Sequence, residues 1–91
     1  MEESPSDVLY RGPLKRSVTI AGHQTSISLE PMFWAALEKQ AGDAGLPLNA
    51  LVARIDAERI AVDDPPNLAS AIRLWLFARS HQPHAALTRN A

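Results

Sequence analysis

Residues 15–29 read Lys15-Arg-Ser-Val-Thr-Ile-Ala-Gly-His-Gln-Thr-Ser-Ile-Ser-Leu29. Apolar and polar side chains alternate along this stretch and many of them are β-branched, which predicts β-strand structure. Gly22 interrupts the alternation, so we expect a β-hairpin here. A two-residue loop of Gly22 and His23 would place glycine at the first central position of a type II′ turn.

This loop sets the pairing of the two strands. It pairs Ile20 with Thr25 and Val18 with Ile27, and Leu29 continues the same face. Slipping the register by one residue would mix apolar and polar side chains on both faces, which favours the pairing given. One face of the hairpin is then apolar, and the opposite face carries Ser17, Thr19, Gln24, Ser26 and Ser28.

Helical spacing replaces the alternation after the hairpin. Glu30-Pro31 ends the strand and begins a first helix, because proline suits the first helical turn. This helix runs to Gly42 or Gly45, a second follows the break at Gly45-Leu46-Pro47, and Asn67 caps a third. The apolar stripes of the three helices are Phe33, Trp34, Leu37 and Ala41; Leu48, Leu51, Val52 and Ile55; and Leu68, Ala71, Ile72, Trp75 and Leu76.

Length and composition restrict the class of protein. The 91 residues contain no cysteine, which excludes disulfides, thiolate zinc sites and cysteine nucleophiles. Apolar residues make up 46%, which is typical of a globular domain, and no apolar run approaches the ~20 residues of a membrane span. The acidic N-terminus is unlike a signal peptide, so we expect a cytoplasmic protein of bacterial type.

The net charge of −1 argues against binding of polyanions through the overall electrostatic field of the chain. Residues 1–14 carry one arginine against three acids (−2), residues 15–62 five of each sign (0), and residues 63–91 three arginines against two acids (+1). We expect residues 1–14 to be a flexible arm, residues 15–80 the folded domain and residues 81–91 a frayed tail.

The third helix is apolar over most of its circumference, since Leu74 and Phe77 flank the Trp75 stripe. A helix of this kind is usually buried on all sides. A core of this size cannot cover so much apolar surface, which predicts an obligate, intertwined homodimer. We expect its interface to contain Ile27, Leu29, Trp34, Leu51, Ile55, Ile72 and Trp75.

Three separated blocks resemble the ribbon-helix-helix superfamily. Thr25-Ser-Ile-Ser-Leu-Glu-Pro31 resembles its strand and helix start, and Gly45-Leu-Pro-Leu-Asn-Ala-Leu-Val52 resembles its interhelical turn and second helix. Residues 15–29, residues 48–55 and the blocks at 67–68 and 71–74 further resemble a subgroup of short bacterial members. The resemblance covers roughly residues 15–77 and implies a mainly α fold: a short β-ribbon, two helices and, here, a third.

The resemblance implies a DNA-binding transcriptional regulator. In this family one strand from each of two chains forms a ribbon that enters the major groove, where base pairs present distinct hydrogen-bonding patterns. By position, Gln24, Ser26 and Ser28 would contact bases. The start of the second helix at Leu48 and Asn49 would hold a phosphate. Lys15 and Arg16 would add contacts to the DNA backbone.

The sequence departs from the family pattern in three places. Ser26 and Ser28 stand where many members have longer side chains that discriminate bases better. Residues 18–20 add a strand, so a dimer could have four strands and a sheet broad for the groove. Pro47 replaces the usual hydroxyl cap of the second helix.

Other interpretations of the same residues stay open. The hydroxyl face could be a solvated sheet face, and Lys15-Arg16 a charged entry to the strand. His81-x-x-His84 with His23 could suggest a metal, but carboxylates and thiolates at ligand spacing are lacking, so we expect no metal and no cofactor. Trp34 and Trp75 suit packing better than a ligand pocket.

The sequence contains no arrangement typical of an enzyme: no glycine-rich phosphate loop, and no nucleophile beside a base. We therefore expect a non-enzymatic DNA-binding dimer. The alternative is a protein-interaction or antitoxin-like module that keeps the same dimer with weak or no DNA binding. The partners expected are a second copy, double-stranded DNA and, in the alternative, another protein, with no membrane.

Overall fold

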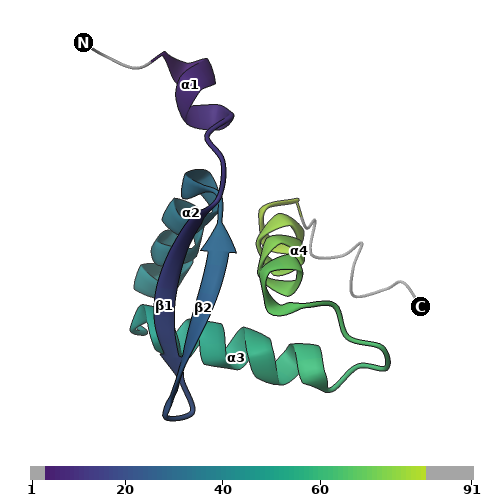
Figure 1. The fold of residues 1–91 in the computed structure, drawn as a ribbon. Coiled ribbons are helices and arrows are strands. Elements are labelled where there is room, and N and C mark those ends of the chain that lie inside the picture. Colours follow the sequence, from purple (N-terminus) through teal and green to yellow (C-terminus); the bar gives the residue numbers. More distant parts are fainter. Residues whose placement is uncertain (1–3, 82–91) are drawn as a thin grey trace.

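The computed structural model describes residues 4–81. The chain forms, in order, α1 (Pro5–Leu9), β1 (Leu14–Ile20), β2 (His23–Leu29), α2 (Pro31–Asp43), α3 (Leu48–Ile60) and α4 (Leu68–His81) (Figure 1). This is the expected hairpin followed by three helices. None of the helices in the described part of the chain is long and apolar enough to cross a membrane.

The hairpin forms where expected, but its turn lies one residue earlier. Ala21 and Gly22 occupy the loop with φ of 52° and 83°, so both central residues are left-handed, as in a type I′ turn. Ile20 pairs with His23 and Val18 with Thr25. The predicted pairing of Ile20 with Thr25 and Val18 with Ile27 is therefore wrong, because the chain uses Gly22 as the second residue of a type I′ turn and not as the first residue of a type II′ turn.

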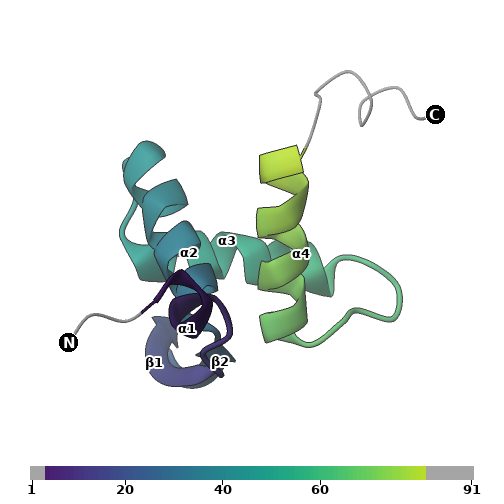
Figure 2. The same cartoon turned by 90° about the horizontal axis from the view of Figure 1, so that it is seen from above.

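The register difference leaves the two faces of the hairpin as predicted. The observed pairing differs from the expected one by two residues, and a strand keeps its side chains on the same face after a shift of two. Val18, Ile27 and Leu29 are buried on one face. Figure 2 shows α2, α3 and α4 all on one side of the hairpin, so the other side is left without a covering element.

Local signals define the helix ends. Pro31 occupies the first turn of α2, and the amide of Leu46 donates to the carbonyl of Ala41 (2.9 Å) around Gly45, whose φ is 69°. This is the Schellman pattern that ends a helix. Asn67 caps α4 as expected, because its side-chain oxygen accepts a hydrogen bond from the amide of Ser70 (2.8 Å).

The core lies between the hairpin and the three long helices. It is formed by side chains from all five elements: Val18, Ile27, Leu29, Trp34, Leu37, Ala41, Leu51, Val52, Ile55, Ala71, Ile72 and Leu76. Six of the seven residues expected at a dimer interface are thus buried by their own chain, and Trp75 is half-buried. Their burial in this structure requires no second copy, and their role between two copies stays a prediction.

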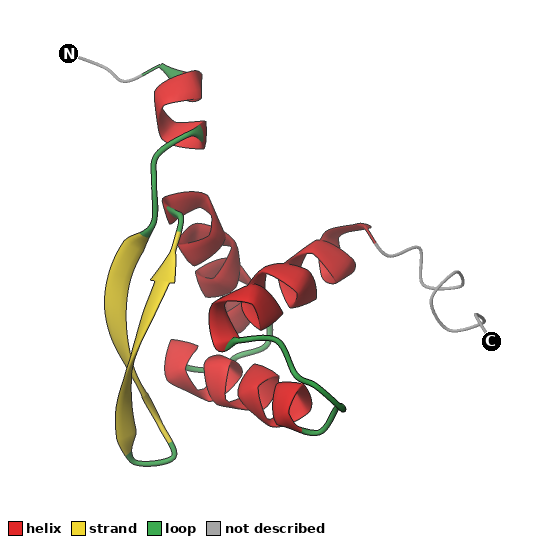
Figure 3. Cartoon of the chain, turned by 45° about the vertical axis from the view of Figure 1, so that its right-hand side comes forward, coloured by secondary structure: helices red, strands yellow, loops and turns green. Residues whose placement is uncertain are grey.

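The N-terminal arm contains a helix that the sequence analysis did not predict. The Ser4 side chain accepts from the amide of Asp7 (3.2 Å), the Asp7 side chain accepts from the amide of Ser4 (3.3 Å), and Pro5 begins the helix. This capping box stabilises the single turn of α1, which lies beyond the open end of the hairpin (Figure 3). The expected tail lies, apart from His81, outside the described residues.

Glu30 joins the end of β2 to α4. Its carboxylate accepts hydrogen bonds from Arg73, at 3.0 Å from Nε and 2.9 Å from Nη2. A hydrogen bond from the backbone amide of Glu30 and then the one from Arg73 hold the pKa of the Glu30 carboxyl below its ordinary value. The ionised form is therefore stabilised in the folded state.

The lowered pKa of Glu30 predicts that its interaction with Arg73 accounts for part of the loss of stability in acid. Above the ordinary pKa the interaction contributes fully to stability; as the pH falls through the lowered pKa, the contribution is lost. Glu30→Gln should therefore lower the free energy of unfolding at neutral pH and flatten its decline in acid. Urea titrations over a pH series measure this, and an unchanged pH dependence would contradict it.

The turn offers a test of the observed register. Ala21→Asn places the preferred Asn-Gly pair in a type I′ turn and should stabilise the protein by roughly 1 kcal/mol, since alanine is strained in the left-handed region. Gly22→Ala should destabilise it for the same reason. Thermal unfolding measures both, and stabilisation by Gly22→Ala would show that the turn is not where the structure places it.

Candidate nucleic-acid interface

The uncovered face of the hairpin is polar over its whole length. The register pairs Lys15 with Ser28, Ser17 with Ser26 and Thr19 with Gln24, and directly opposed residues share a face. All six side chains are exposed. These six residues are here called the hydroxyl face. Four of them, Lys15, Gln24, Ser26 and Ser28, belong to the expected site. The other two, Ser17 and Thr19, were not part of it, although the alternation of the strands places them on this face.

The charge of the hairpin differs from that of the whole chain. Residues 14–29 contain Lys15 and Arg16 and neither aspartate nor glutamate. The acidic residues of the rest of the described chain lie on α1, at Glu30, on α2 and α3, and in the loop before α4. The hydroxyl face is thus free of acidic side chains, which removes the local repulsion that a phosphate backbone would otherwise meet.

Arg16 lies on the other face of the hairpin. Its guanidinium stacks on the Trp34 ring, 4.4 Å from the centroid, and Nη1 lies 3.1 Å from Oε2 of Glu38. Consecutive strand residues point to opposite faces, so Lys15 and Arg16 cannot both lie on the hydroxyl face. The structure thus does not bring Arg16 together with Lys15, and the contact of Arg16 with the DNA backbone stays a prediction.

Trp34 connects this stack to the first strand. Its Nε1–H donates to the carbonyl of Leu14 (2.9 Å), and 4% of the residue is exposed. A buried indole N–H needs such a partner. Arg16, Trp34 and Leu14 therefore hold β1 against α2, which is a structural role and leaves Lys15 as the cation of the hydroxyl face.

The outer edge of β2 is open to a further strand. The two-residue turn makes Ile20–His23 a hydrogen-bonded pair, so Gln24, Ser26 and Ser28 direct their backbone groups away from β1. Among residues 4–81, the N–H and C=O groups of these three residues have no partner from another element. An unprotected edge of this length can pair with another chain.

Comparison with protein families identifies the fold. Residues 13–80 match the model of the ribbon-helix-helix domain. The chain belongs to the ribbon-helix-helix family. No curated protein and no solved structure matched it. The expected ribbon-helix-helix fold, a two-stranded hairpin followed by helices, is confirmed, whereas the intertwined homodimer stays a prediction; both β1 and β2 lie within the matched residues.

The start of α3 holds the residues expected to bind a phosphate. Leu48 and Asn49 are the first residues of this helix, which begins on the β1 side of the hairpin and crosses toward α4 (Figure 1). Pro47 provides no side-chain cap, and the amides of Ala50 and Leu51 donate to the carbonyl of Pro47. The amides of Leu48 and Asn49 are those that a helix start leaves for an anion.

The histidines do not form a cluster in the described chain. His23 is exposed beside the turn, as expected, and His81 stacks on Phe77 with ring centroids 4.1 Å apart. His84 lies outside the described residues. Within residues 4–81 no group of three histidine, cysteine, aspartate or glutamate residues could hold a metal.

The opposite positions of Lys15 and Arg16 predict opposite effects on stability. Arg16→Ala should lower the free energy of unfolding by about 1 kcal/mol, because it removes a cation–π contact and a partly exposed ion pair. Lys15→Ala should change stability little, because Lys15 is exposed on the uncovered face. Urea unfolding measures both variants, and equal effects would contradict the assignment of faces.

Proposed function

We propose that this ribbon-helix-helix protein binds double-stranded DNA as a homodimer and acts as a transcriptional regulator in the cytoplasm, on the nucleoid. The observation that carries the proposal is the hydroxyl face: a ribbon surface that no helix covers and that contains no acidic side chain. Family members are generally DNA-binding regulators or antitoxins, and the geometry of this face supports the former.

Two chains would join through the open edge of β2. Antiparallel pairing of β2 with β2 of a second copy satisfies the free groups of Gln24, Ser26 and Ser28 and gives a sheet of four strands. The two β2 strands then lie at its centre and carry the proposed base contacts. The two β1 strands lie at its margins and carry Lys15.

The widths of the sheet and of the major groove favour different DNA contacts for the central and the marginal strands. Three strand spacings of ~4.8 Å span about 14 Å, whereas the major groove is ~12 Å wide. The central β2 strands would enter the groove, and the β1 strands would lie over its rims, where the phosphates are. Lys15 and the amides of Leu48 and Asn49 would then bind phosphate, while short serine side chains would give weak discrimination between bases.

This arrangement predicts salt-sensitive binding in which Lys15 acts uniformly on all sequences. Lys15→Ala should weaken binding to random and genomic duplexes alike and reduce the slope of log K against log salt by about one per chain. Fluorescence anisotropy at two salt concentrations measures this. Gln24→Ala should instead reduce the difference in affinity between duplexes.

Lys39→Ala is the matched control. Lys39 lies on α2, outside the hairpin. Its side chain is 73% exposed and is paired with Asp43 (3.1 Å). Its replacement removes the same charge and should leave DNA binding unchanged. No binding of the wild-type chain at micromolar concentration and low salt would refute the proposed function.

A second candidate is a protein-interaction or antitoxin-like role of the same fold. Large apolar side chains on α4, away from the hydroxyl face, favour it: Leu74 is 62% exposed and Phe77 61%. An exposed apolar surface of this kind marks an interaction site more often than a DNA contact. Absence of DNA binding together with an intact fold would favour this role.

A further inference from the structure

The N-terminal arm has an apolar face that the structure leaves exposed. Pro5, Val8 and Leu9 share one side of α1, because residues three and four apart lie on the same face of a helix. Val8 is 43% exposed and Leu9 46%, and α1 contains no buried residue. A single helical turn without packing is marginal in water, so this arm becomes more stable when its apolar face is covered.

An apolar groove of about 380 Å³ lies near the arm, between α2 and α4. Large apolar side chains form most of its walls, and two of them, Met32 and Phe77, are exposed. The groove extends from the first turn of α2 to Ser80 in the last turn of α4. This is the end of the molecule at which α1 lies (Figure 1).

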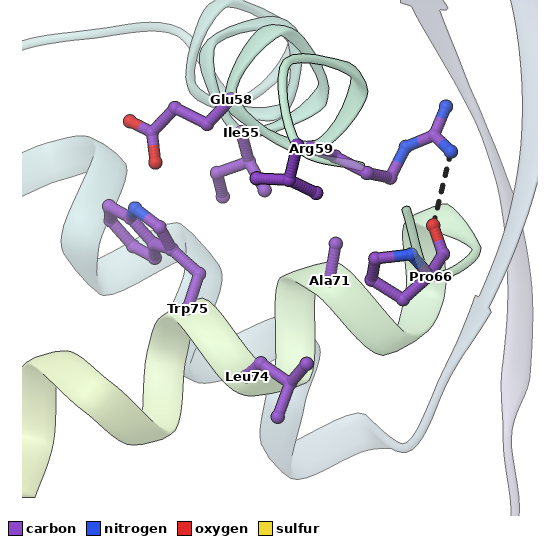
Figure 4. A pocket seen from close by; sticks show the side chains of 8 residues that line it. Ile55, Glu58, Arg59, Pro66, Ala71, Leu74 and Trp75 are labelled. Carbon is purple, nitrogen blue, oxygen red and sulfur yellow. Dashed lines mark hydrogen bonds between the residues drawn. The ribbon is translucent and has the colours of Figure 1, made fainter. Parts of the chain in front are cut away.

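A second hollow on α4 suits the arm less well. It measures about 310 Å³, lies between α3 and α4, and includes Trp75, Glu58 and Arg59 in its lining. Figure 4 shows Glu58 at one side of this hollow and Arg59 bonded to the carbonyl of Pro66 (3.1 Å) at another. The carboxylate of Glu58 would repel an acidic segment. This hollow also lies against the first two turns of α4, whereas α1 lies beyond the other end (Figure 1).

The connection between α1 and the hairpin is long enough to bring the arm to the α2–α4 groove. β1 begins beside the first turn of α2, since the carbonyl of Leu14 accepts a hydrogen bond from Trp34 (2.9 Å). Met32 of the groove lies in that same turn. Residues 10–13 separate α1 from β1. Extended at ~3.4 Å per residue, they span roughly 14 Å, more than the ~10 Å diameter of a helix.

The charges of the arm and of the α2–α4 groove are complementary. Residues 1–14 carry one arginine against three acids, a net charge of −2. Among the described residues that line the groove, Lys39 is the charged one, and its partner Asp43 lies outside that lining. The pair of Lys39 and Asp43 is highly exposed. Such a pair contributes little to stability, so Lys39 can exchange Asp43 for a carboxylate of the arm.

We propose that the arm, residues 4–10, folds back and covers the α2–α4 groove of its own chain. The apolar face of α1 would lie against Met32 and Phe77, with the acidic side chains of the arm beside Lys39. The structure shows the open arrangement, in which α1 lies beyond the end of the hairpin (Figure 3), and rotation about residues 10–13 converts it to the closed one.

The closed arm goes beyond the proposed function and does not rest on DNA binding. It bears on the second candidate role, because Phe77 is one of the exposed side chains that favour a protein partner. A partner that binds α4 at Phe77 must first displace the arm. The arm would thus control access to this part of the surface.

Cross-linking tests the proposed contact directly, because the chain has no cysteine of its own. Leu9→Cys with Ser80→Cys places one thiol on the apolar face of α1 and one in the lining of the groove. A disulfide needs Cα atoms within about 7 Å, so mild oxidation should close it within one chain only when the arm is docked. A non-reducing gel shows closure as faster migration of the monomer. Leu9→Cys with Ser17→Cys, whose second thiol lies on the hydroxyl face, is the matched control and should close severalfold more slowly.

Oxidation of Met32 by peroxide tests how fully the arm covers the groove. Val8→Gln with Leu9→Gln should raise the rate of sulfoxide formation severalfold, because the thioether loses its cover. Ile60→Gln with Val62→Gln removes two exposed aliphatic side chains outside the groove and should leave the rate unchanged. Mass spectrometry of peptides measures the rates, and circular dichroism melts check that each variant is folded.

Three results would overturn the inference. The first is a Leu9→Cys, Ser80→Cys chain that closes no faster than the control pair. The second is equal oxidation of Met32 in the wild-type chain and in the arm variant. The third is a cross-linked product of doubled mass, which would place the arm of a second copy in the groove. DNA enters none of these experiments, so their failure leaves the proposed function untouched.

Discussion

Burial of one face of the hairpin is the constraint on which the rest of this structure depends. Val18, Ile27 and Leu29 pack against the helices, and the period of two then forces their neighbours in the strands to the opposite side. The hydroxyl face is thus a consequence of the core. Lys15 faces solvent for the same reason that Arg16 faces Trp34, so a strand of seven residues separates a surface exposed to solvent from a surface for packing.

The hairpin also changes how a ribbon-helix-helix chain can associate. A strand of the same chain already pairs with one edge of β2, and the core residues of one chain are buried without a second copy. The proposed association of two copies would therefore rely on what the single chain leaves uncovered, such as the open edge of β2. Leu74 and Phe77 are part of the exposed apolar surface predicted for the third helix. Trp34, Leu51 and Ile55, which were predicted at a dimer interface, are instead buried by their own chain.

Local patterns predicted the elements well because each had a local cause. The alternation at residues 15–29, Pro31 at a helix start and Asn67 as a cap each act within a few residues. The register was harder to predict, since glycine suits the first central position of a type II′ turn and the second of a type I′ turn, and both turns match the twist of the strands. The turn of α1 was missed because its signal is a single capping box without apolar periodicity.

The sequence by itself determined the order of elements, the two faces of the hairpin, the apolar stripes of the helices and the resemblance to the family, because all of these follow from spacing along the chain. Only the tertiary structure decided which stripe residues are covered within one chain, that Arg16 joins β1 to Trp34 and Glu38, and that Leu74 and Phe77 stay outside. These depend on how elements distant in sequence pack together. Spacing shows which side of a helix is apolar, but the neighbour that covers it is set in three dimensions.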